Sequence, residues 1–134
     1  MVPHWRSVDP KKDSLVRDFY EMATAPFWVT HSSNTVLERK ALFSMDCWFP
    51  EGETVYEDLD FWIRVGSHFS VAHSNKVCAT YRRITEVNAR TVHIGKVVYS
   101  KTFMDTLHQL MADPDIPKRR KYWIAEIIDI RMVP

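Results

Sequence analysis

Glycine is scarce in this chain: only three glycines occur among its 134 residues, against seven prolines. Tight hairpins and phosphate-binding loops need glycine because their backbones adopt positive φ angles or approach a ligand closely. The scarcity therefore argues against a fold built from glycine-rich phosphate loops or many short hairpins. A hydrophobic content of 46%, including five tryptophans, is sufficient for a sizeable core. The sequence thus predicts one globular domain rather than a disordered chain or a coiled coil.

The charges of the chain nearly cancel. Its 18 Lys and Arg against 17 Asp and Glu leave a net charge of +1, which gives no reason to expect a nucleic-acid partner. Their distribution is uneven, because acids but no basic residues lie between Ala41 and Ile63. A basic run, Lys118 to Lys121, stands near the C-terminus. We interpret this run as the solvated start of a helix, with a weak contact to anionic lipid headgroups or phosphate as the alternative.

Cysteine usage and the N-terminal residues indicate the compartment. Cys47 and Cys78 show no CxxC spacing and no nearby His at ligand spacing, which favours free thiols in a reducing cytosol. The first residues turn polar almost at once, unlike a signal peptide. No apolar run approaches the roughly 20 residues that cross a bilayer. We therefore expect a cytoplasmic protein, with the membrane surface as the alternative location.

Hydrophobic periodicity predicts an α+β fold in which short strands pack with helices. Helices are expected over residues 11–25, 38–44, 54–65 and about 97–111, followed by a last helix that carries Trp123, Ile124, Ile127 and Ile128 on one face. Strands are expected over residues 27–30, 69–73 and 77–81, the last two forming a hairpin. Pro26 and Gly66 are expected to end the helices that precede them.

The acidic start of the helix over residues 54–65 has two interpretations. Thr54 and Glu57 fit a capping box, and Asp60 and Arg64 are spaced for a surface ion pair. Each acid therefore has a structural explanation. A helix N-terminus at the edge of a cleft can equally hold a carboxylate that accepts a proton from a substrate hydroxyl. Aromatic residues nearby, including Trp62, would suit the apolar faces of a sugar. The residues alone leave both interpretations open.

A longer series of motifs resembles the second half of family 2 glycosyltransferases, which have the GT-A fold. It begins with Ser32-Ser33, which precedes an Arg-containing segment, and continues with Trp-Phe-Pro-Glu-Gly-Glu at 48–53. Glu-Asp-Leu-Asp-Phe-Trp-Ile-Arg follows at 57–64, and a strand ends in Tyr81-Arg82. The resemblance covers about residues 27–83. The Glu-Asp helix and the Tyr-Arg strand at this spacing are its most specific part, although the His that follows Tyr-Arg in many members is replaced by residues 83–85, Arg-Ile-Thr.

The resemblance implies transfer of a sugar from a nucleotide-diphosphate donor to an acceptor hydroxyl, with inversion. By position, Asp58 would be the general base that deprotonates the acceptor, and Glu57 its neighbour at the helix start. The residues that the resemblance places on the substrate side are Ser32, Ser33, Tyr56, Trp62, Tyr81 and Arg82. Trp62 and Arg64 would also pack and orient the helix. The partners implied are a sugar acceptor and a nucleotide-sugar donor.

The family's nucleotide-binding half, with its Asp-x-Asp metal motif, has no counterpart in these residues. Asp113-Pro114-Asp115 has the letters of the motif, but its place at a helix break predicts a turn. We therefore expect residues 27–84 to form a partial GT-A fold on the acceptor side, after an N-terminal arm and helix (1–26) and before a helical extension (85–134). No cofactor is expected in this chain. A divalent metal, Mg or Mn, is expected only if the missing half is supplied, and the isolated chain is expected to be inactive.

The alternative is a small α+β protein-interaction module without chemistry, in which Glu57, Asp58 and Asp60 only cap a helix. Geometry separates the two. An Asp58 that points into an open groove beside Trp62 and Tyr81 favours the enzyme, whereas a buried carboxylate bound by backbone N–H groups favours the module. In the full GT-A fold this half completes the sheet begun by the first half, so strand edges and apolar faces would be exposed here. We therefore expect a homo-oligomer or a complex with a partner polypeptide.

Overall fold

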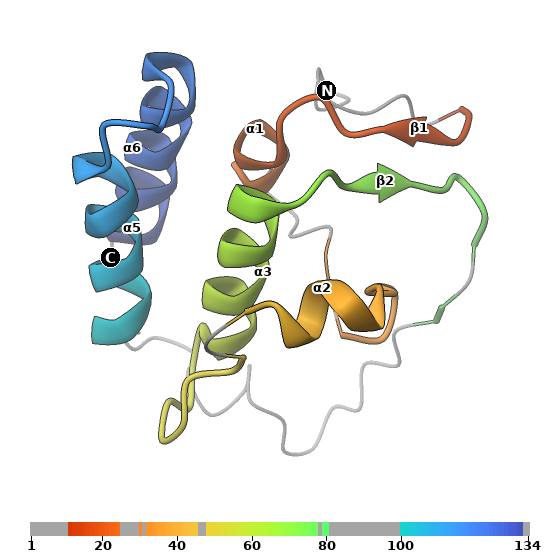
Figure 1. The fold of residues 1–134 in the computed structure, drawn as a ribbon, viewed down its shortest axis with the longest axis horizontal. Coiled ribbons are helices and arrows are strands. Elements are labelled where there is room, and N and C mark those ends of the chain that lie inside the picture. The colour runs from red at the N-terminus through yellow and green to blue at the C-terminus, as the bar shows by residue number, and fades with distance from the viewer. Residues whose placement is uncertain are drawn as a thin grey trace.

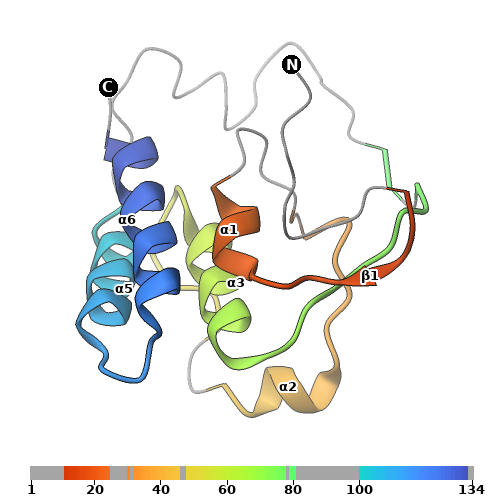
Figure 2. The ribbon, with the colours of Figure 1, turned by 90° about the horizontal axis from the view of Figure 1, so that it is seen from above.

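The computed structural model describes residues 11–24, 30, 32–45, 48–77, 79–80 and 100–132. Within these ranges the fold combines helices with a small two-stranded sheet, so the general α+β class is confirmed. The elements are β1 (Ser14–Leu15), α1 (Phe19–Ala23), α2 (Arg39–Phe43), α3 (Glu57–His68), β2 (Ala72–His73), α5 (Lys101–Ala112) and α6 (Lys118–Met132). Figures 1 and 2 show their arrangement.

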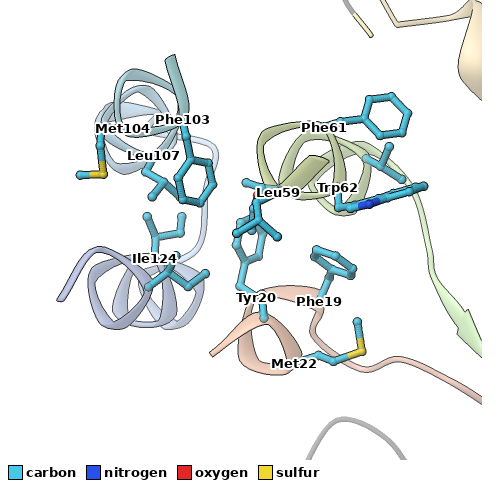
Figure 3. Packing of buried hydrophobic residues seen from close by; sticks show 14 residues of the cluster. Phe19, Tyr20, Met22, Leu59, Phe61, Trp62, Phe103, Met104, Leu107 and Ile124 are labelled. Atoms are coloured by element: carbon cyan, nitrogen blue, oxygen red, sulfur yellow. The ribbon is translucent and has the colours of Figure 1, made fainter. Parts of the chain in front are cut away.

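The core lies among α1, α3, α5 and α6. Helix α1 packs against α3 and α6, and α5 packs against the same two helices, so the four form a closed ring of contacts. Figure 3 shows the side chains that fill it. Tyr20, Ile63, Phe103, Leu107 and Ile124 have no exposed surface. The segments predicted to be an N-terminal arm, an acceptor-side unit and a C-terminal extension each contribute helices to this one core.

The sheet joins β1 and β2 as an antiparallel pair, with Ser14 opposite His73. The N–H of Val16 continues the pairing by donating to the Val71 carbonyl at 2.8 Å. The predicted hairpin between residues 69–73 and 77–81 is therefore wrong in its partner, because Ala72–His73 pairs with the N-terminal strand instead. Residues 78 and 81 lie outside the described residues, as does the predicted strand over 27–29.

The first helix is shorter than its periodicity predicts. Residues 11–25 were expected to be helical, yet α1 begins only at Phe19. Asp18 has an extended backbone (φ −148°) and its side chain accepts the N–H of Tyr20 at 3.1 Å, which is the geometry of an N-cap. Leu15, which matched the helical spacing, is in β1 and is exposed. Ser14 and Leu15 pair with β2, so these residues are in a strand and not in the helix.

Helix α3 is displaced along the chain from its predicted bounds of 54–65. It begins at Glu57 and continues through Gly66 to His68. Gly66 was expected to end the helix, but it is buried within it. A Cβ added at Gly66 would lie 2.3 Å from Cδ1 of Phe19. The glycine therefore allows α1 and α3 to approach closely, and the helix continues because its packing compensates for the weak helix propensity of glycine.

The predictions for α2 and α6 are confirmed, whereas α5 (Lys101–Ala112) begins later than the predicted start at about residue 97; residues 97–99 lie outside the described residues. Helix α2 falls within 38–44, and Leu42 and Met45 contact the core although neither is fully buried. Helix α5 begins after Ser100, whose hydroxyl accepts the N–H of Phe103. Asp113 forms the predicted turn, since its side chain accepts the N–H of Asp115 at 2.8 Å. Helix α6 buries Ile124 and Ile127, as its spacing predicts.

Candidate functional site

The candidate site lies at the N-terminus of α3, where the chain turns sharply into the helix. Tyr56 is the N-cap and has φ +60°, the left-handed conformation that L-residues other than glycine rarely adopt. Its carbonyl accepts the N–H of Asp60 at 2.9 Å. The predicted capping box, with Thr54 as the N-cap, is therefore wrong. The N-cap is Tyr56, two residues after Thr54, and Glu57 and Asp58 are in the first turn of the helix.

Glu57 and Asp58, the predicted base and its neighbour, are both half-buried. One oxygen of Asp58, Oδ1, accepts the N–H of Leu59 at 2.8 Å. No ion pair or side-chain hydrogen bond engages the carboxylate of Glu57 or the second oxygen of Asp58 within the described ranges. A negative charge in this first turn is stabilised by the partial positive charge of the helix N-terminus. Both carboxylates therefore remain able to accept a hydrogen bond from another molecule.

Asp60, two residues further on, serves the fold. It is only 1% exposed, and its Oδ2 accepts from Nε of Arg64 at 2.9 Å. The Thr106 hydroxyl of α5 donates to its other oxygen. The ion pair with Arg64 was predicted, but as a surface pair, and it is instead buried between two helices. Because both of its oxygens have partners, Asp60 joins α3 to α5 and has little capacity left for a substrate.

Glu53, in the loop before α3, also has a structural role. Its Oε1 accepts from the Thr102 hydroxyl and, at 3.4 Å, from the Thr102 N–H at the start of α5. The hydrogen bond from the Thr102 hydroxyl is the main cause that lowers the pKa of Glu53 below its ordinary value. The sequence did not indicate this contact, because Glu53 and Thr102 are far apart in the chain. The loop that leads into the candidate site is thereby held to α5.

The aromatic candidates at α3 are mostly taken up by the core. Trp62 is 5% exposed and packs edge-on against Phe61 at 4.8 Å. Its Nε1 is buried and has no hydrogen-bond partner in the part of the chain that is described. Trp62 therefore does not present its ring for stacking on a sugar, as the sequence had suggested it could. Tyr56 is half-buried, with its ring 5.6 Å from that of Phe103.

The remaining predicted substrate residues lie elsewhere. Ser32 and Ser33 are exposed and belong to a turn. Tyr81 and Arg82 lie outside the described residues. The sequence analysis asked whether Asp58 points into an open groove beside Trp62 and Tyr81. Of these two aromatic residues only Trp62 is described, and its ring is buried in the core.

Two aromatic residues near α3 belong to the 48–53 motif but were not predicted as site residues. Trp48 and Phe49 are each 44% exposed and precede the loop that leads to Tyr56. The carbonyl of Trp48 accepts from Arg64, and the Phe49 ring stacks on Phe61 at 4.5 Å. The signal that could have revealed them is two adjacent large aromatic residues just before a Pro-Glu-Gly turn. Phe61 lies one helical turn after Asp58, so Phe49 packs against the same helix as the candidate base.

The described part of the chain has neither a metal-binding cluster nor a membrane-spanning helix. The described residues contain no group of three or more His, Cys, Asp or Glu side chains that could hold a metal ion. No helix among them is long and apolar enough to cross a membrane. No protein-family model, curated protein or solved structure matches this chain.

Proposed function

We propose that this chain provides the acceptor side of an inverting glycosyltransferase with a partial GT-A fold, in which Asp58 is the general base. The observation that carries the proposal is that the acids around α3 differ in how many hydrogen-bond partners their carboxylates have. Glu53 and Asp60 are engaged by Thr102, Arg64 and Thr106. Asp58 keeps one carboxylate oxygen without a partner among the described residues. The family's motif assigns the base to this same position.

The local backbone supports a functional role for this position. Tyr56 holds a left-handed conformation directly before Glu57 and Asp58, and such strained residues collect at functional sites because the surrounding structure must stabilise them. The helix that carries Asp58 is anchored by Phe61, Ile63 and Val65, which are at most 5% exposed. A base on such a helix keeps a fixed position relative to a bound acceptor.

In the proposed reaction the acceptor hydroxyl gives its proton to the Asp58 carboxylate as the acceptor oxygen bonds to the anomeric carbon of the donor sugar. The bond from that carbon to the nucleotide diphosphate breaks in the same displacement, so the anomeric configuration inverts. We propose that a partner polypeptide or another part of a longer chain supplies the nucleotide-binding half. A Mg or Mn ion held there would stabilise the charge of the departing diphosphate.

Acceptor binding is testable on the chain by itself, because the Leu59 amide is hydrogen-bonded to Asp58 and reports on that carboxylate. Methyl glycosides of the common hexoses are titrated into the ¹⁵N-labelled chain. We expect a saturable shift of the Leu59 amide with at least one glycoside, and a weaker response in Asp58→Asn. Asp105→Asn changes an exposed acid of α5 and should respond like the wild type. A panel that shifts no amide of residues 56–59 would contradict the proposal.

The catalytic role is tested by combining the chain with the separately expressed nucleotide-binding half of a family 2 enzyme. Transfer of labelled sugar from nucleotide-sugar donors is then measured. We expect Asp58→Asn to lower transfer by about 10²–10⁴-fold, the usual contribution of a general base, while Asp105→Asn leaves it unchanged. Equal transfer by the wild type and Asp58→Asn would remove Asp58 from the mechanism.

A non-catalytic interaction module is the second candidate, and one observation favours it. Oδ1 of Asp58 accepts a backbone N–H at the start of α3, as a purely structural residue would. On this alternative Asp58→Ala lowers stability by about 0.5–1.5 kcal/mol, the net contribution of one hydrogen bond, and no glycoside shifts the Leu59 amide. The titration described above therefore separates the two functions.

A further inference from the structure

One face of α5 contacts the chain on both sides of Asp58. The Thr102 hydroxyl donates to Glu53, which precedes the candidate base, and the Thr106 hydroxyl donates to Asp60, which follows it. Because Thr102 and Thr106 are four residues apart in a helix, their side chains lie on the same side of α5. The segment from Glu53 to Asp60, which we call the α3 entry, is therefore attached to α5 at both of its ends.

The same face of α5 also supports the left-handed turn within the α3 entry. The Phe103 ring lies 5.6 Å from the ring of Tyr56. The Tyr56 carbonyl accepts the N–H of Asp60, whose side chain is held by Thr106. A residue other than glycine keeps φ +60° only where its surroundings determine that conformation. Two of the contacts that do so come from α5, one directly and one through Asp60.

The hydrogen bond of Asp58 is of a different kind. Its Oδ1 accepts the N–H of Leu59, so this bond orients the carboxylate within the first turn of α3 but does not fix that turn relative to another helix. The hydrogen bonds from Thr102 and Thr106 join separate elements and do fix it. A displacement of about 1 Å at a reacting group can lower a rate by about 10²-fold. The placement of the candidate base therefore depends on α5 as well as on α3 itself.

We propose that Thr102 and Thr106 are positioning residues, which hold the α3 entry so that the second oxygen of Asp58 meets the acceptor hydroxyl. Neither threonine takes a proton or touches the substrate, because each acts through the acid that it holds. Both lie beyond residues 27–83, so a segment outside the resemblance to glycosyltransferases completes the acceptor side. The inference rests on the proposed function for the identity of the acceptor, whereas the geometry of the α3 entry is tested without any sugar.

Nuclear spin relaxation of the ¹⁵N-labelled whole chain, without sugar, tests that geometry. Thr106→Val removes the hydroxyl that holds Asp60, and Thr106→Ser keeps it. We expect the amide order parameters of residues 57–59 to fall from about 0.85 to below about 0.6 in Thr106→Val, and Thr106→Ser to keep the wild-type values. A threonine that only stabilises the fold would change the urea midpoint without this local motion. Thr102→Val should act in the same direction and replaces Thr106→Val if that variant does not fold.

Glycoside titration of the same variants tests the consequence for binding. With a methyl hexoside that shifts the Leu59 amide of the wild type, we expect Thr106→Val to weaken binding by about 2–10-fold, the usual contribution of one hydrogen bond. Thr106→Ser should bind like the wild type. As a matched control, Thr24→Val removes a hydroxyl that donates to the Glu21 carbonyl of α1 at 2.8 Å, and it should match the wild type in both measurements.

The positioning role and the proposed function fail in different ways. Unchanged order parameters in both valine variants overturn the positioning role, and glycoside binding by the wild type then still supports the proposed function. Order parameters that fall while glycoside binding keeps its wild-type strength also overturn the positioning role, because the α3 entry then does not place the acceptor. A wild type that binds no glycoside, while Thr106→Val loosens residues 57–59, contradicts the proposed function and supports the hold of α5 on the α3 entry.

Discussion

The ring of Phe19 occupies the space that a side chain at Gly66 would fill, since a Cβ there would lie 2.3 Å from Cδ1 of Phe19. We predict that Gly66→Ala destabilises the protein by about 1–3 kcal/mol, the usual cost of overpacking a core. Helix propensity alone would instead favour alanine by about 1 kcal/mol, so the sign of the change identifies the cause. Urea unfolding measures it.

A double-mutant cycle serves as the control for this prediction. A Phe19→Ala background removes the two nearest ring atoms but keeps the Cβ of residue 19, 2.9 Å from the added Cβ, so Gly66→Ala should there cost clearly less than in the wild type. An equal cost in both backgrounds would show that the contact with Phe19 is not what requires glycine in α3.

We predict that the ion pair of Asp60 and Arg64 contributes far more to the free energy of unfolding than the pair with the same spacing on α5. The side chain of Asp60 is 2% exposed, whereas that of Asp105, paired with Lys101, is 48% exposed. Asp60→Ala should cost about 3–5 kcal/mol, because the Arg64 charge loses its buried partner. Asp105→Ala should cost less than about 1 kcal/mol. Similar costs for the two variants, measured by thermal or urea unfolding, would contradict the structural role given to Asp60.

Local signals predicted the helices that end the chain. Ser100 caps α5, the apolar residues of both helices recur at helical spacing, and Asp113 turns the chain between them. All of these act within a few residues of one another, so the sequence displays them directly. The short helix α2 was predictable for the same reason, although its exposure was not, because exposure depends on what other segments cover.

Contacts between distant segments decided where the predictions were wrong. Leu15 fits a helical pattern, but pairing of Ser14 with His73 makes its segment a strand. Gly66 was predicted to end a helix, but it lies within α3, where the neighbouring Phe19 ring leaves no room for a side chain. At the candidate site, Thr106 turns a predicted surface ion pair into a buried one. Asp58 was predicted as the base from the motif alone. Only the fold shows that its second carboxylate oxygen has no hydrogen-bond partner among the described residues.

The left-handed backbone of Tyr56 leads to a comparison of two substitutions. Alanine and glycine both remove the ring, including its contact with Phe103, and glycine tolerates φ +60° far better than alanine. We predict that Tyr56→Gly is more stable than Tyr56→Ala by about 1–2 kcal/mol, the cost of a left-handed L-residue. At an ordinary helical position the order is reversed. Finding alanine the more stable of the two by urea unfolding would mean that Tyr56 is not strained in solution.

The hydrogen bond between Glu53 and Thr102 predicts a loss of stability in acid. The Thr102 hydroxyl lowers the pKa of Glu53 in the folded protein below its ordinary value of 4.5. A lowered folded pKa means that the unfolded chain binds a proton more readily. The stability contributed by ionised Glu53 is therefore fully present above the unfolded pKa and is lost as the pH falls through the lower folded pKa.

Unfolding free energies are measured from pH 6 down to pH 3. They should decline less steeply in Glu53→Gln than in the wild type. Asp13, whose pKa is lowered mainly by the Asn75 N–H, continues to titrate in both proteins. Thr102→Val removes the same hydrogen bond from the other side and should show the same weaker decline. If both variants keep the wild-type slope, the carboxylate of Glu53 does not hold the start of α5 in solution.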